Sequence, residues 1–167
     1  DTYGVRHALV VGPNSGYGTD NRCLLDVIKK SNGRFKGVAV VANDTSTADL
    51  AALKAQGIVG IAFNATRLGV GHWQNTTDLL KRMADLDLFL QLQVEKDQIL
   101  AFKDLLDATT VHLVIDHCGI PDVGAGDGAD ITVEDPEVVA VAKSEHGVAD
   151  AVAAIVGHRD ERAELVG

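Results

Sequence analysis

The residues best placed to do chemistry are Asp116 and His117, which directly follow a short, mostly apolar and β-branched run at 111–115. Such a run is typical of a buried strand in a parallel sheet. In parallel α/β folds, ligands bind at the carboxyl ends of the strands, which is where this pair would lie. An imidazole at that position suits catalysis or metal binding. The structural alternative is that Asp116 caps the next segment and His117 hydrogen-bonds only to backbone.

Other motifs in the sequence are incomplete. Gly16-x-Gly18-x-x-Asn21 lacks the third glycine of a dinucleotide-binding loop, and no acidic residue ends the following strand. Ser15 lies outside any Gly-x-Ser-x-Gly pattern, so we interpret it as a hydrogen-bond donor to substrate rather than a nucleophile. The six histidines show no metalloprotease spacing, so a metal site needs ligands from separate strand ends, and only His117 is well placed.

Five predicted strands, alternating with helices, position these residues. The strands are expected at 6–12, 36–42, 58–64, 88–94 and 111–116, and the helices at 21–31, 48–56, 77–86 and 97–107. This alternation predicts an α/β fold with a parallel sheet, either an open doubly wound sheet or a (β/α)8 barrel. In the fourth strand, Gln91, Gln93 and Glu95 share one face by period two, which indicates a barrel interior or the floor of an active site.

Composition separates the chain into two parts. The 167 residues are 46% hydrophobic, which suits a globular domain, and the net charge of −9 excludes a nucleic-acid surface. No apolar run approaches the roughly 18 residues that span a membrane. Two cysteines without a CxxC motif, and no basic-then-apolar leader, predict a cytoplasmic location. Residues 123–167 carry 3 basic against 10 acidic residues, so we predict a main domain at 1–122 and an acidic tail at 123–167. The tail is expected to be irregular or helical, with helices near 136–142 and 148–156.

Four motifs, in this order and spacing, resemble those of one known family. They lie at 18–21 (GTDN), 34–41 (RFKGVAVV), 60–64 (GIAFN) and 115–122 (IDHCGIPD). The chain resembles the amidohydrolase-related, metal-dependent TIM-barrel hydrolases, in the branch of the 2-pyrone-4,6-dicarboxylate lactonases, over about residues 3–122. This resemblance implies a partial TIM barrel that corresponds to strands two to six of eight, and hence a fragment of a longer barrel.

The resemblance also implies a function for particular residues. It implies a hydrolase in which water attacks the carbonyl of a lactone or a related ester or amide. His117 would be the catalytic histidine, either as a ligand of a divalent metal such as Zn²⁺ or Mn²⁺ or, without a metal, as a polariser of the carbonyl group. Ser15, Asn64 and Gln93 would bind the substrate, and Arg67 would meet a substrate carboxylate.

The sequence departs from that family in ways that leave alternatives open. The family's His-x-His of strand one and its late aspartate have no counterpart, so the chain is either an active lactonase or an inactive barrel fragment that forms homo-oligomers through open sheet edges. Ala62 and Ile120 replace arginines of the family, which argues against a dicarboxylate substrate. The segment 144–149 also resembles part of a haloacid-dehalogenase-type phosphatase, but no nucleophilic Asp-x-Asp precedes it.

Overall fold

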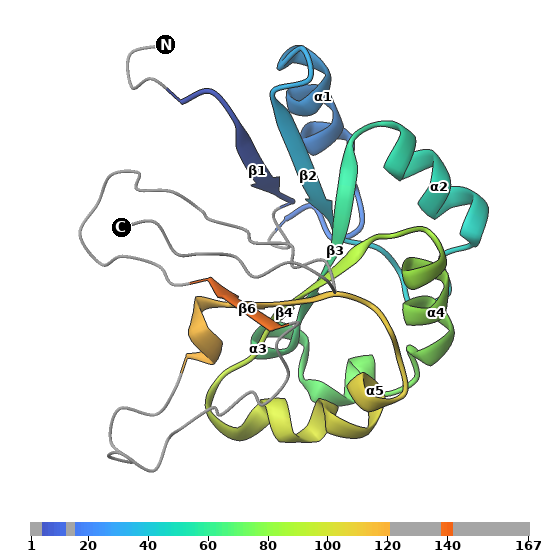
Figure 1. Cartoon of the computed structure of the whole chain (residues 1–167), viewed down its shortest axis with the longest axis vertical. Helices are drawn as coiled ribbons and strands as arrows, with labels where there is room; N and C mark the ends of the chain where they lie inside the picture. The colour runs from blue at the N-terminus through green and yellow to red at the C-terminus, as the bar shows by residue number, and fades with distance from the viewer. Residues whose placement is uncertain (1–4, 13–15, 121–137, 142–167) are drawn as a thin grey trace, which may run out of the picture.

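The strands form a single parallel sheet in which spatial order follows chain order. The computed structural model describes residues 5–12, 16–120 and 138–141. The strands are β1 (Ala8–Val11), β2 (Phe35–Ala39), β3 (Ile58–Asn64), β4 (Phe89–Gln93), β5 (Leu113–Asp116) and β6 (Val138–Val141). A doubly wound sheet reverses its strand order at a switch point, whereas a barrel adds each strand beside the last. The order β1 to β6 therefore confirms the predicted partial TIM barrel (Figure 1).

Helices follow the strands along one side of the sheet (Figure 1). The α-helices are α1 (Arg22–Lys30), α2 (Thr47–Ala55), α3 (Ala65–Leu68), α4 (Thr77–Asp85) and α5 (Lys103–Asp107), and the 3₁₀ helices are η1 (Val70–Trp73), η2 (Lys96–Phe102) and η3 (His117–Gly119). Helix α1 contacts β1 and β2, α2 contacts β3, and α4 contacts β4. The Ser46 hydroxyl caps α2 by accepting a hydrogen bond from the Asp49 N–H. None of the described helices is long and apolar enough to span a membrane.

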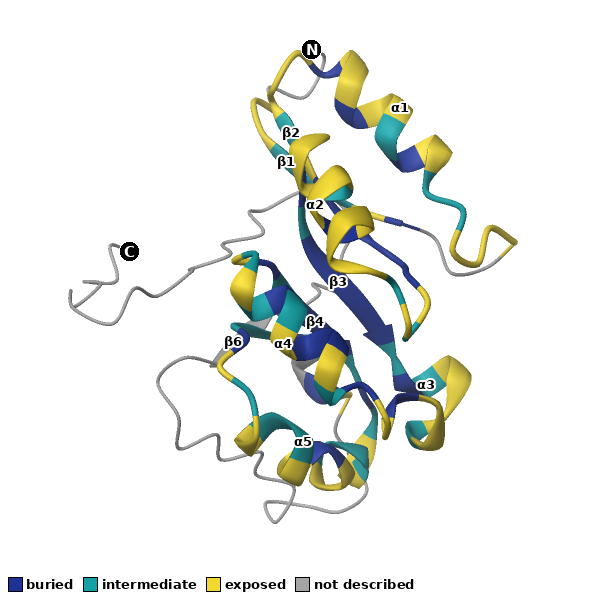
Figure 2. Cartoon of the chain, turned by 90° about the vertical axis from the view of Figure 1, so that its right-hand side faces the viewer, coloured by how far each residue is buried: buried dark blue, intermediate teal, exposed yellow. Residues whose placement is uncertain are grey.

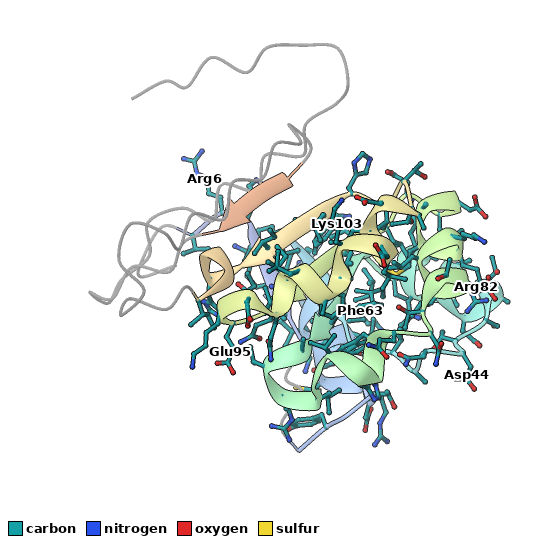
Figure 3. All side chains as sticks on the ribbon, turned by 90° about the horizontal axis from the view of Figure 1, so that it is seen from below. Arg6, Asp44, Phe63, Arg82, Glu95 and Lys103 are labelled. Atoms are coloured by element: carbon teal, nitrogen blue, oxygen red, sulfur yellow. The ribbon has the colours of Figure 1, made fainter. Side chains whose placement is uncertain are left out.

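The core lies between the sheet and these helices. Alternate strand residues point toward the helices and are buried, among them Ala39, Ile61, Phe63, Leu90, Leu92 and Ile115. Figure 2 shows this buried layer in β3 and the exposed outer faces of the helices. In Figure 3, Phe63 lies inside the molecule while Asp44 and Arg82 lie toward its rim. The opposite face of the sheet has a smaller apolar cluster of Val38, Val40 and Ala62. The two sheet faces thus differ as period-two patterning requires.

Two of the predicted helices differ from the observed elements, and a third is not tested. The helix predicted at 97–107 begins as the 3₁₀ helix η2 and becomes α-helical only in α5. The helix predicted near 136–142 is wrong, because Val138–Val141 forms strand β6 and pairs in parallel with β5. Four β-branched or small apolar residues in a row suit a strand, and pairing with β5 decides between the two. The second predicted tail helix, at 148–156, lies outside the described residues.

Gly60 lies where a side chain would meet its neighbour on β4. A Cβ atom at Gly60 would be 2.5 Å from the ring of Phe89, the residue paired with it across the two strands. We expect Gly60→Ala to lower the free energy of unfolding by about 1–3 kcal/mol, because the ring has to move. Urea denaturation measures this change. Gly71→Ala is the matched control, since no atom lies within 4 Å of its added Cβ, and it should leave stability nearly unchanged. Equal stabilities for the two variants would contradict the prediction.

Candidate functional site

Asn64 and Gln93 meet at the carboxyl ends of neighbouring strands. Asn64 ends β3, Gln93 ends β4, and the sheet register places them opposite each other. The Asn64 Nδ2 donates a hydrogen bond of 2.8 Å to the Gln93 Oε1. Both residues are half-buried. The structure therefore brings together two of the predicted substrate-binding residues at the edge where parallel folds bind ligands.

The Asp116–His117 pair occupies the corresponding end of β5. The Asp116 Oδ1 accepts a hydrogen bond of 3.1 Å from the His117 backbone N–H, so the predicted capping role of Asp116 is present. The Asp116 Oδ2 also lies 3.4 Å from the His117 Nε2, so the imidazole faces the carboxylate. The Gln91 Nε2, from β4, donates a hydrogen bond of 3.1 Å to the same Oδ2. The His117 side chain is 34% exposed and Asp116 20% exposed, so solvent or a substrate reaches the imidazole.

Left-handed backbone gathers beside this pair. His117 has φ of +52°, Ile120 has +44°, and Lys96, just past the end of β4, has +53°. The Lys96 N–H donates a hydrogen bond of 3.0 Å to the Ile120 carbonyl oxygen, which ties the ends of β4 and β5 together. A β-branched residue such as Ile120 rarely adopts positive φ. Strain of this kind concentrates at functional sites, so its presence here supports this edge as the candidate site.

The segment after β3 is built on Asn64. Its Oδ1 accepts hydrogen bonds from the Thr66 hydroxyl (2.7 Å) and from the Arg67 backbone N–H (2.9 Å), which begins α3. Arg67 therefore contacts the site through its backbone, while the residue as a whole is exposed. A few residues later, the Trp73 ring is buried and stacks on Phe63 with centroids 4.1 Å apart. This stack fixes the loop that follows Asn64. Ser15, the remaining predicted substrate-binding residue, lies outside the described residues.

An ion pair near the end of β1 neutralises two charges at the rim of this edge. The Arg22 guanidinium donates to both oxygens of Asp20, with a shortest distance of 2.6 Å, in the loop that precedes α1. These hydrogen bonds lower the pKa of the Asp20 carboxyl from 3.8 to about 2. The partner carboxylate likewise raises the pKa of Arg22.

Replacing Arg22 should be visible in the titration of Asp20. We expect Arg22→Ala to raise the pKa of Asp20 from about 2 part of the way toward 3.8, because the guanidinium hydrogen bonds to the ionised form are lost while the backbone N–H of residue 22 still donates to it. A pKa below the unfolded value means that this carboxylate stabilises the fold above about pH 3.8, and that the contribution disappears as pH falls through about 2. Carboxyl ¹³C shifts followed by NMR measure the pKa directly. An Asp20 pKa that stays near 2 in the variant would contradict the assignment of cause.

Asp116 and His117 offer one carboxylate and one imidazole to a metal ion. Within the described ranges, no group of three or more His, Cys, Asp or Glu side chains is placed to hold one. Catalytic zinc sites use three protein ligands. The described part of the site therefore does not form a metal centre by itself.

Two residues of this arrangement have no specific role in the sequence-based prediction. The sequence predicts Asp116 as the partner of His117 at the strand end without a role of its own, and Gln91 only as part of a polar strand face. The period-two polar face of β4 is the signal that points to Gln91, because it places an amide on the side away from the helices. The contact between Gln91 and Asp116 was not predictable from this pattern, because it depends on which strand pairs with β4.

Comparison with known proteins identifies a family profile and several relatives. The profile, described as amidohydrolase, matches residues 1–159, which extends beyond residue 122 where the sequence resemblance ended. A 2-pyrone-4,6-dicarboxylate hydrolase from Comamonas testosteroni is 31% identical over 112 residues, covering 66% of this chain and 37% of that protein. A 4-sulfomuconolactone hydrolase from Hydrogenophaga intermedia is 30% identical over 122 residues, covering 70% of this chain and 39% of that protein.

A solved structure shows the same fold. A Pseudomonas putida protein, described as a 2-pyrone-4,6-dicarboxylic acid hydrolase, is similar with a TM-score of 0.68 and 26% identity, covering 82% of this chain and 53% of that chain. The present chain thus spans about two fifths of the length of the curated relatives and about half of this solved relative.

Proposed function

Because the chain belongs to the amidohydrolase family, we propose that it is part of a hydrolase that opens a lactone ring by attack of water on the ester carbonyl. The observation that carries this proposal is the polar cluster of Asn64, Gln93, Asp116 and His117 at the carboxyl ends of β3 to β5. Relatives that share this part of the chain are named as hydrolases of a pyrone dicarboxylate and of a sulfomuconolactone. Each of those names describes ring opening of a cyclic ester or a closely related compound.

The residues of the cluster have separate roles in the proposed reaction. The water oxygen bonds to the carbonyl carbon, the ring C–O bond breaks, and one proton of the water passes to the ring oxygen, which gives a hydroxy acid. His117 donates a hydrogen bond to the carbonyl oxygen, where negative charge develops. Asn64 and Gln93 bind polar groups of the substrate through their amides. Ser15 and Arg67 keep their proposed role as further substrate contacts.

The charge of the candidate site limits how many negative groups its lactone substrate can carry. Ala62, opposite Gln91 in the sheet, is buried, and Ile120 beside His117 is an exposed aliphatic residue. Neither provides the cation that a substrate carboxylate requires. We therefore propose a lactone with fewer negative groups than the dicarboxylate named for the Comamonas testosteroni relative.

The experiment is a panel of lactones that differ only in charge. Proton release at constant pH follows turnover of a neutral lactone and of its mono- and dicarboxylate forms, each with and without added Zn²⁺ or Mn²⁺. We expect turnover of the neutral or monocarboxylate form to exceed that of the dicarboxylate. Stimulation by a metal in the wild type but not in His117→Ala would assign His117 as a metal ligand, and equal rates with and without metal would favour carbonyl polarisation. No turnover of any lactone by the folded chain would contradict the proposed function.

A non-catalytic role is the second candidate, and the edge strand β1 supports it. In the described sheet β1 pairs only with β2, and its Val11 is 43% exposed. An edge of this kind presents unpaired backbone groups to another chain. Sedimentation velocity over a range of concentrations tests it: association in a chain that hydrolyses no lactone would favour the oligomeric fragment, whereas an active monomer would exclude it.

A further inference from the structure

Gln91 is a buried amide in the middle of strand β4, where an apolar residue is expected. Three polar side chains are buried among the described residues, and Gln91 alone of them lies in a strand. Its cross-strand neighbours are Ala62 on β3 and Val114 on β5, which offer it no polar group. An apolar side chain would fill the same space without the cost of burying an amide.

Only one end of this amide is hydrogen-bonded. The Gln91 Nε2 donates to the Asp116 Oδ2 at 3.1 Å, whereas the Gln91 Oε1 is buried and has no partner among the described residues. A buried acceptor without a partner costs about 1–3 kcal/mol, so it calls for an explanation. The geometry explains the buried amide by the hydrogen bond that its Nε2 donates to Asp116.

That bond fixes the carboxylate that faces His117. Asp116 has its Oδ1 held by the His117 backbone N–H, and its Oδ2 held by Gln91. With both oxygens anchored, the carboxylate has one orientation, and its Oδ2 lies 3.4 Å from the His117 Nε2. Neighbouring strand residues normally point to opposite faces, and the left-handed φ of His117 allows its ring to return toward Asp116.

We propose that Gln91 is a positioning residue, which orients the Asp116 carboxylate and through it the imidazole of His117. Gln91 acts from the strand interior and has no contact with the reacting atoms. Only the expected change in kcat rests on the proposed function, because the orientation of the imidazole is measurable without any substrate.

The test replaces Gln91 with methionine, which keeps an unbranched side chain of similar length and removes both polar atoms. In Gln91→Met we expect the ring ¹H–¹⁵N resonances of His117 to move, and kcat to fall about 10-fold with KM within twofold, as for loss of a residue that orients a functional histidine. The His117 resonances are assigned by their loss in His117→Ala. The matched control is Gln56→Met on the exposed end of α2, which should change neither the resonances nor kcat.

A double-variant cycle shows whether Gln91 works through Asp116. In an Asp116→Ala background, Gln91→Met should lower kcat no further, because the carboxylate that it orients is absent. Gln91→Leu is the second variant in case the methionine variant does not fold, and it should move the same resonances because leucine has no group that can donate to Asp116.

The following results would overturn the proposal. Unchanged His117 resonances in both Gln91 variants would do so, as would an equal loss of kcat from Gln91→Met with and without Asp116. A rise in KM alone would assign Gln91 as a substrate contact instead, and thus also contradict it. If the wild-type chain hydrolyses no lactone, the proposed function fails while the resonance comparison still decides the role of Gln91.

Discussion

Replacing Trp73 with alanine should lower the free energy of unfolding by about 3–5 kcal/mol, the range for removing a fully buried aromatic side chain. Trp73 is 1% exposed, stacks on Phe63 at 4.1 Å with an interplanar angle of 15°, and contacts the His72 ring edge-on. The variant loses this stack and leaves a cavity beneath the loop that follows Asn64. Because that loop is built on the Asn64 side chain, we also expect the Asn64–Gln93 hydrogen bond to weaken.

Trp73→Phe is the variant that separates ring stacking from simple burial. It keeps an aromatic ring against Phe63 and removes the indole N–H, which is buried without a partner among the described residues. We therefore expect it to cost less than half as much as Trp73→Ala. Urea denaturation of both variants gives the comparison, and amide exchange at 65–73 reports on the loop. A loss below about 1 kcal/mol for Trp73→Ala would contradict the assigned role of the stack.

The regular elements were predictable because local residue patterns determine them. The strand at Ile58–Asn64 was predicted residue for residue, since a β-branched run is bounded there by Gly57, whose φ is +98°. The face alternation of β4 was also predictable, and Leu90 and Leu92 are buried as expected. Ser46 caps α2 for the reason that its spacing to Asp49 indicates. In each case the signal lies within about ten residues.

The rest depends on contacts between distant residues. Periodicity did not distinguish an open sheet from a barrel, because that choice lies in strand order rather than in any strand. The short segments α3 and η1 were missed, since they follow from the Asn64 cap and the Trp73 stack instead of from an amphipathic pattern. The segment Val138–Val141 is predicted as helical from its own residues, whereas its pairing with the distant strand β5 determines that it forms β6.

Replacing His117 with alanine should lower kcat/KM for lactone hydrolysis by about 10²–10⁴-fold, the usual range for loss of a group that stabilises the charge of the transition state. The alanine removes the ring that faces Asp116 at 3.4 Å and leaves the carboxylate held by Gln91 and the backbone. The free energy of unfolding should change by less than about 1 kcal/mol, because the imidazole is 34% exposed. Loss of activity in a stable chain would thus report on chemistry.

His72→Ala is the matched control for this variant. His72 is also an imidazole in a 3₁₀ helix after a strand, but it is exposed and packs edge-on against Trp73, apart from the Asp116–His117 pair. We expect it to keep kcat/KM within about twofold of the wild type, because it removes surface packing and no group of the candidate site.

The most direct measurement is the initial rate of ring opening of the best lactone from the panel by the wild type, His117→Ala and His72→Ala at equal folded concentration. Proton release gives the rate, and the mass of the product, one water heavier than the lactone, identifies the reaction. We predict turnover by the wild type and by His72→Ala, and a loss of at least about 100-fold in His117→Ala. Equal turnover by all three chains would contradict it, because the reaction would then occur without the histidine at the end of β5.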